Sequence, residues 1–130
     1  GNNRFASIER LLEGGTYTKW NSNGTYTKPE DDEDFSTTLQ AFSHWSYEVT
    51  NRFCMVVDVQ GIKTDDSTFI LTDPGIHCVN ETRFGDTNLS TEGFSLFFKS
   101  HKCNMICKAL KLKRRNKLDS IKVGTGAVKC

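Results

Sequence analysis

Hydrophobic residues are most regularly spaced between Arg52 and Gln60. One side of this stretch would carry Phe53, Met55, Val57 and Val59, and the other Cys54, Val56, Asp58 and Gln60. Such a period of two predicts a β-strand that is central and buried and that ends at Gly61. Asp58 is the exception in this strand, because a carboxylate near the end of a core strand is rarely buried without a partner.

Three further stretches have strand-forming composition. Phe69–Thr72 predicts a short neighbouring strand, which the Asp73-Pro74-Gly75 turn ends. Residues 16–20 and 25–28 are rich in Thr, Tyr and Trp, and the turn formers of residues 21–24 separate them. Because Asn-Gly tolerates positive φ, this pattern predicts a β-hairpin.

Helical spacing appears twice. Leu39, Phe42 and Tyr47 give residues 38–48 an apolar face, and Thr37 or Thr38 could cap the start of this helix. A second helix is expected to begin at a Ser90 N-cap, to carry three phenylalanines and to end near Ser100. Those phenylalanines are Phe94, Phe97 and Phe98.

Charge adds two polar segments to this plan. The chain has 130 residues and a net charge of +1, which fits one domain with an ordinary soluble composition. An acidic loop spans residues 29–37, and residues 113–130 form a basic tail that we expect to be disordered. No apolar run is long enough to cross a membrane and no signal-peptide pattern is present, so we expect a cytoplasmic protein with no membrane insertion by this segment.

Cysteine and histidine cluster in the spacing His101-x-Cys103-x-x-x-Cys107. Five cysteines, an odd number, favour reduced thiols and metal over disulfides. Cys103 and Cys107 share one helical face, whereas His101 would lie about 200° away, so one shared ion requires a helix break after His101. The alternative is two buried cysteines beside an unrelated surface histidine. A tetrahedral zinc site needs a fourth ligand, and spacing does not choose between His44 and His77.

Oxygen-bearing side chains converge at the predicted strand ends. Asp58 and Gln60 share one strand face, and Asp73 ends the neighbouring strand, so the three could hold Mg²⁺ together with substrate phosphates. Equally, Asp58 could be a hydrogen-bonded core carboxylate and Asp73 a turn residue. Lys19, next to the hairpin turn, could contact phosphate or simply be solvated.

Six strings occur together in one order, over roughly residues 9–112. They are Lys19-Trp20-Asn21-Ser22-Asn23, Ala41-Phe42-Ser43-His44-Trp45-Ser46-Tyr47-Glu48, Val57-Asp58-Val59-Gln60-Gly61, Leu71-Thr72-Asp73-Pro74, Phe84-Gly85 with Asn88-Leu89, and Phe97-Phe98 through Cys107. In these strings the chain resembles the alpha-kinases, a family of atypical protein kinases. The resemblance implies an α+β fold that corresponds to the C-terminal lobe of an alpha-kinase, with a small mixed or antiparallel sheet, packed helices and a structural zinc site, over residues 1–112.

The resemblance also implies residue roles. Zinc would be bound by His44, His101, Cys103 and Cys107. Asp58 matches the catalytic aspartate, and Gln60 and Asp73 match the magnesium-binding positions. Lys19 and Asn23 match residues near the nucleotide phosphates and the catalytic centre. Glu9 lies near the hinge that contacts adenine, although its spacing to Lys19 is one residue longer than in the family.

Two departures bear on activity. The family's glycine-rich loop reads Phe-Gly-x-Gly-Asn-Leu-Gly, and here Thr87 and Ser90 replace the later glycines. The family's N-terminal lobe, with its phosphate-contacting lysine, has no counterpart in this segment. The expected function is transfer of the ATP γ-phosphoryl group to a Ser or Thr of a protein substrate, with Mg²⁺, and the chain alone would be inactive without an N-lobe or partner chain.

The alternative is a non-catalytic, zinc-stabilised interaction module, either a pseudokinase or half of a split domain. No nucleic-acid role is expected, because no aromatic residue is interleaved with the basic tail.

Overall fold

The computed structural model describes residues 3–29, 36–64 and 68–115. The strands are β1 (Thr18–Lys19), β2 (Cys54–Val57), β3 (Gln60–Lys63), β4 (Phe69–Thr72) and β5 (Gly75–Cys78). The helices are α1 (Ser36–Val49), η1 (Gly85–Thr87), α2 (Ser90–Ser100) and α3 (Met105–Ala109). None of the helices in the described ranges is long and apolar enough to cross a membrane.

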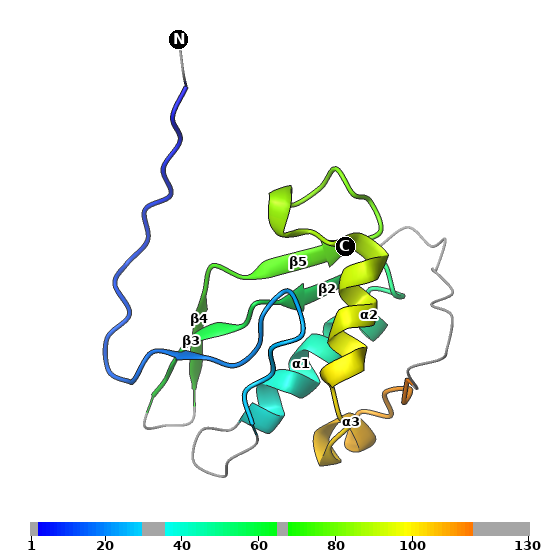
Figure 1. The fold of residues 1–130 in the computed structure, drawn as a ribbon. Coiled ribbons are helices and arrows are strands. Elements are labelled where there is room, and N and C mark those ends of the chain that lie inside the picture. Colours follow the sequence, from blue (N-terminus) through cyan, green and yellow to red (C-terminus); the bar gives the residue numbers. More distant parts are fainter. Residues whose placement is uncertain (1–2, 30–35, 65–67, 116–130) are drawn as a thin grey trace.

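The strands form two small antiparallel sheets, one in the order β1-β3-β4 and the other pairing β2 with β5 (Figure 1). Both belong to one bent ribbon. Val57 pairs with Gly75 in one sheet, and Gln60 pairs with Thr72 in the other, so the register is the same on both sides of the bend. The sequence predicts one continuous strand over residues 52–60. That prediction is wrong at Asp58, where φ is 55° and the strand divides.

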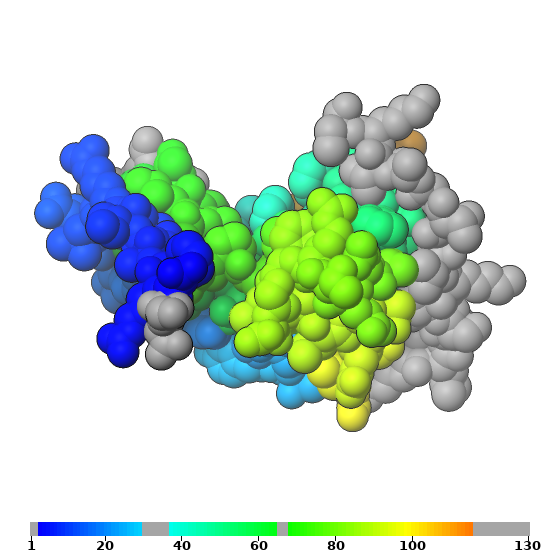
Figure 2. All heavy atoms as spheres, turned by 90° about the horizontal axis from the view of Figure 1, so that it is seen from above, coloured from blue at the N-terminus to red at the C-terminus, as the bar shows by residue number. Residues whose placement is uncertain are grey.

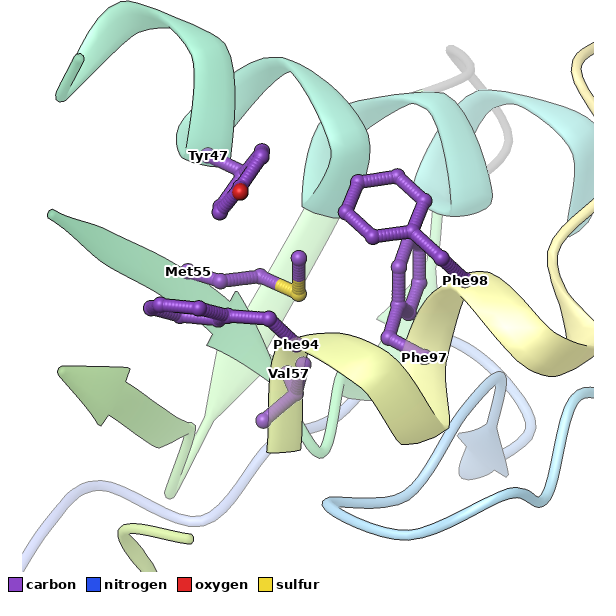
Figure 3. Close-up of a cluster of buried hydrophobic side chains, with 6 residues drawn as sticks. All are labelled: Tyr47, Met55, Val57, Phe94, Phe97 and Phe98. Carbon is purple, nitrogen blue, oxygen red and sulfur yellow. The ribbon is translucent and has the colours of Figure 1, made fainter. Parts of the chain in front are cut away.

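The core lies between the β2–β5 ribbon and the helices. α1 packs on β2, and α2 packs on β5. Figure 3 shows one buried cluster to which α1, β2 and α2 all contribute. Its members are Tyr47, Met55, Val57, Phe94, Phe97 and Phe98. The predicted alternation therefore holds within β2, where Met55 and Val57 are buried.

Several element boundaries differ from the predictions. Gly61 lies inside β3 rather than ending a strand, and Thr37 and Thr38 lie inside α1 rather than capping it. Strand β5 was not predicted at all. α2 begins at Ser90 with Leu89 as its N-cap, so Ser90 is not the predicted cap.

The hairpin of residues 16–28 is present in reduced form. Asn21 bridges Thr27, and the Lys28 amide donates to the Trp20 carbonyl over 2.8 Å, but only Thr18–Lys19 is a strand. The acidic run of residues 30–34 and the tail from residue 116 lie outside the described residues. Arg115, which the sequence places in the tail, is instead anchored by an ion pair with Glu48 at 3.1 Å.

Candidate active site and metal centre

The first candidate site lies at the bend in the ribbon. The Lys19 Nζ is 2.5 Å from Asp58 Oδ1, which joins β1 to the end of β2. The Gln60 amide nitrogen lies 3.4 Å from Asp58 Oδ2 and donates to the main-chain oxygen of Asp73 over 3.2 Å. The structure thus brings together Lys19, Asp58, Gln60 and the Asp73 backbone, and we call this group the carboxylate centre.

Both aspartates of the carboxylate centre have left-handed backbone conformations. Asp58 has φ 55° and Asp73 has φ 45°, and the two occupy the points where the ribbon passes from one sheet to the other. A non-glycine residue in this region is uncommon, although Asp tolerates it better than most. Such strained residues gather at functional sites, so the bend is a site candidate on backbone grounds alone.

Asn21 supports the carboxylate centre and was assigned by the sequence only to a turn. Its side chain is fully buried, and its Oδ1 accepts from the Val59 amide over 3.0 Å. Its Nδ2 donates to Gln40 over 3.2 Å and to Ser43 over 3.0 Å, both on α1. Asn21 therefore connects α1 to the backbone directly after Asp58. In the sequence, the only indication that Asn21 belongs to the site was its position within the Lys19–Asn23 string.

The second candidate site is the group His44, His101, Cys103 and Cys107, which we call the His–Cys cluster. Their potential ligand atoms all lie within 4.8 Å of one another. α1 supplies His44, while the other three come from the end of α2 and the start of α3. His101 is extended at φ −68° and ψ 131°, and α3 begins at Met105 behind an Asn104 cap. The helix break predicted from the spacing is therefore confirmed.

The distances in the His–Cys cluster match the edges of a zinc tetrahedron. Bond lengths of about 2.0–2.1 Å to nitrogen and about 2.3 Å to sulfur give edges of about 3.3 Å and about 3.6 Å. In the structure, His44 Nδ1 lies 3.2 Å from His101 Nε2. His44 Nδ1 lies 3.7 Å from Cys103 Sγ, and His101 Nε2 lies 3.6 Å from Cys107 Sγ. The residues present therefore fit a four-coordinate zinc ion.

Burial sets the protonation of the His–Cys cluster. It lowers the pKa of His44, and burial together with the His44 charge lowers the pKa of His101 to about 4. Both rings are thus neutral near pH 7, as metal ligands must be. Burial also raises the pKa of Cys107, so its thiolate needs a nearby cation, and a bound metal ion provides one.

The remaining predicted residues lie elsewhere. His77, the other possible fourth ligand, is buried on β5 and bonds to Asn23 and Leu89, outside the His–Cys cluster. The Thr72 hydroxyl donates to the Glu9 carboxylate, and the Asn23 amide nitrogen donates to the Thr87 carbonyl over 3.3 Å.

The segment of residues 84–90 lies across a hollow from β1, β3 and β4 (Figure 2), whereas the hairpin tip at Asn23 contacts it directly. Seen from above, the surface is hollowed between the blue and green part, which holds β1, β3 and β4, and the yellow-green part that follows β5 (Figure 2). Ser90, which stands where the family has glycine, has φ 52°. The chain therefore keeps a glycine-like backbone at this position.

The motifs and the fold agree with comparisons to known proteins. A family model described as the alpha-kinase family matches residues 1–107. The chain is 47% identical over 108 residues to alpha-protein kinase vwkA of Dictyostelium discoideum, covering 83% of the chain and 16% of vwkA. It is 41% identical over 105 residues to human eukaryotic elongation factor 2 kinase, covering 81% of the chain and 13% of that kinase.

The architecture matches as well. The crystal structure of the alpha-kinase domain of myosin heavy chain kinase A in complex with ADP superposes with a TM-score of 0.69 at 37% identity, covering 82% of the chain and 38% of that domain. The chain thus spans well under half of the relatives it matches. Sequence motifs, family model and fold agree, and the chain belongs to the alpha-kinase family.

Proposed function

We propose that this chain contributes the catalytic and metal-binding centre of a protein kinase that transfers the γ-phosphoryl group of ATP to Ser or Thr of a protein substrate. The observation that carries the proposal is the bend, where two left-handed aspartates and Gln60 meet at the junction of the two sheets. Support also comes from the relatives, which are named as protein kinases, one of them in complex with ADP.

Each residue of the carboxylate centre has a proposed role. Asp58 would accept a hydrogen bond from the substrate hydroxyl and orient it toward the phosphorus atom. The Gln60 amide nitrogen is engaged by Asp58 and Asp73, so its Oε1 is the atom that would face a cation, together with the Asp73 carboxylate. Mg²⁺ bound there would neutralise charge on the phosphates. Lys19 would add positive charge beside them.

Two residues would lie on the nucleotide side. Asn23 is proposed near the phosphates, and Glu9, whose carboxylate contacts Thr72 directly before Asp73, is proposed near the adenine. Zinc in the His–Cys cluster would be structural, because four protein ligands leave no open position for chemistry. Turnover is expected in the full-length gene product rather than in this chain alone, which covers 38% of a known alpha-kinase domain.

The test is Asp58→Asn in the full-length gene product, since Asn tolerates the left-handed conformation and keeps the side-chain shape. Transfer of ³³P from labelled ATP to Ser- and Thr-containing peptides should fall by at least about a hundredfold. Glu81→Gln is the matched control, because Glu81 is exposed in the turn after β5. If Asp58→Asn retains the wild-type rate, Asp58 does not have the proposed role.

A wild-type protein that binds Mg·ATP but transfers no phosphate would contradict the kinase proposal itself. A wild-type protein with no measurable Mg·ATP affinity would instead favour the non-catalytic interaction module.

A further inference from the structure

His77 is a buried histidine that joins two segments distant in sequence. Its side chain is fully buried on β5. On one side its Nε2 lies 2.8 Å from the main-chain oxygen of Asn23, at the tip of the hairpin. On the other side its Nδ1 lies 3.1 Å from the Leu89 amide nitrogen, at the end of the 84–90 loop. The imidazole therefore bridges the hairpin and the loop through their backbones.

The two partners fix the chemical state of the ring. A carbonyl oxygen can only accept and an amide can only donate, so the proton is on Nε2 and the ring is neutral. Burial, which lowers the pKa of His77, acts in the same direction. Both nitrogens are used, which leaves His77 no atom for a metal.

The ring is also held by packing. A Cβ on Gly93 would lie 2.4 Å from the imidazole, so α2 approaches His77 as closely as glycine allows. Phe94 meets the ring edge-on with a centroid distance of 6.4 Å. The imidazole thus has little freedom to rotate away from its two hydrogen-bond partners.

A parallel contact joins the same two segments. The Asn23 amide nitrogen donates to the Thr87 carbonyl, and the loop is itself fixed to β5, where Asn88 Oδ1 accepts from the Cys78 amide over 2.9 Å. The hairpin that His77 holds includes Lys19, whose ammonium group contacts Asp58. The position of the loop is therefore linked through His77 to the carboxylate centre.

We propose that His77 is a positioning residue that clips the hairpin to the 84–90 loop. The clip would align the carboxylate centre with the loop across the hollow, where the protein substrate would lie. The role of the clip in turnover rests on the proposed kinase function. The clip itself is a contact between two backbone segments, and its existence does not depend on the proposed kinase function.

Three variants at His77 separate the two bonds. His77→Phe keeps the ring and removes both bonds. His77→Gln can place an amide nitrogen near Nε2 and keep the bond to Asn23, and His77→Asn can place an oxygen near Nδ1 and keep the bond to Leu89. Glu81→Gln, at an exposed side chain in the turn after β5, is the control.

The structural readout is amide hydrogen exchange in this chain. We expect His77→Phe to speed exchange at Leu89 and in residues 21–27 by about fivefold, since one buried hydrogen bond contributes about 1 kcal/mol. Zinc content should not change. The Gln and Asn variants should loosen mainly the segment whose bond they lose. Unchanged exchange in all three variants would overturn the clip, whether or not the protein is a kinase.

The functional readout is steady-state kinetics in the full-length gene product. We expect KM for the peptide substrate to rise about tenfold in His77→Phe and less in the Gln and Asn variants. Partial unfolding would lower kcat through loss of active protein and leave KM unchanged. Faster exchange with unchanged KM would overturn the positioning role. An inactive wild-type protein would refute the proposed function and this role with it, while the exchange result for the clip would stand.

Discussion

Removal of the zinc ion proposed for the His–Cys cluster is expected to be the most decisive perturbation of this fold. The cluster joins α1, through His44, to the segment between α2 and α3. α3 has only five residues, too few to be a stable helix without tertiary contacts. Without an ion, two imidazoles and two thiols would share a space in which His44 and Cys107 are fully or almost fully buried. A further hydrogen bond joins the start of α3 to α1, from the Asn104 amide nitrogen to the Thr37 carbonyl over 2.8 Å.

The magnitude follows from comparing two free energies. Structural zinc contributes about 10–16 kcal/mol of apparent binding free energy in zinc-finger peptides at pH 7. The whole free energy of unfolding of a typical domain is about 5–15 kcal/mol. Even a fraction of the zinc contribution is therefore comparable to the total stability. We expect the zinc-free chain to be largely unfolded at 37 °C rather than slightly destabilised.

The assay combines metal analysis with thermal unfolding. We expect one zinc per chain by mass spectrometry of the metal, and loss of helical circular dichroism when a strong chelator removes it. Cys107→Ser should reproduce the loss. Cys54→Ser is the matched control, because Cys54 is partly buried and lies outside the His–Cys cluster. A chain that keeps its melting temperature after complete zinc removal would refute the reasoning.

Three further predictions concern stability. Acid should destabilise the zinc-loaded fold. Burial lowers the pKa of His101 to about 4, so the unfolded chain, with the ordinary value of 6.5, binds protons first. The free energy of unfolding in urea should therefore fall by at least about 2 kcal/mol between pH 7 and pH 5. Gly61→Ala should lower the free energy of unfolding by more than about 2 kcal/mol by the same measurement, because φ is 149° and a Cβ would lie 2.0 Å from a backbone oxygen of β4. Gly24→Ala, where the nearest contact of a Cβ would be at 3.7 Å, should be near neutral. Phe94 is a fully buried core residue, so Phe94→Ala should lower the free energy of unfolding by about 3–5 kcal/mol. Phe5 is 93% exposed, so Phe5→Ala should change the melting temperature by less than about 2 °C. Equal effects of the two substitutions would contradict the core assignment.

The sequence predicted the parts of the fold that local chemistry determines. The period of two predicted β2, and the spacing of His101 and Cys103 predicted the break between α2 and α3. The bend at Asp58 could not be predicted this way, because the apolar alternation continues through Val59 while the backbone turns at Asp58. Asp also resembles an ordinary strand-end residue in sequence, and the bend is supported by a tertiary contact, the hydrogen bond from the Val59 amide to the Asn21 side chain.

Strand β5 was missed for a related reason. Gly75–Cys78 is four residues long, follows a proline and contains a histidine, so it has neither the length nor the alternation of a typical strand. Its structure comes from pairing with β2 and from α2 packing against it. The role proposed for His77 could not be predicted without this strand, and spacing alone left His77 as a possible metal ligand.

The two sites of this molecule are connected through consecutive residues of α1. His44 belongs to the His–Cys cluster. Its neighbour Ser43 accepts a hydrogen bond from Asn21, whose Oδ1 accepts from the Val59 amide directly after Asp58. A shift of α1 caused by loss of one metal ligand would therefore move the backbone at the bend. Even a structural zinc ion is then expected to influence turnover, and a zinc-ligand variant that remains folded should lose more activity than its folded fraction accounts for.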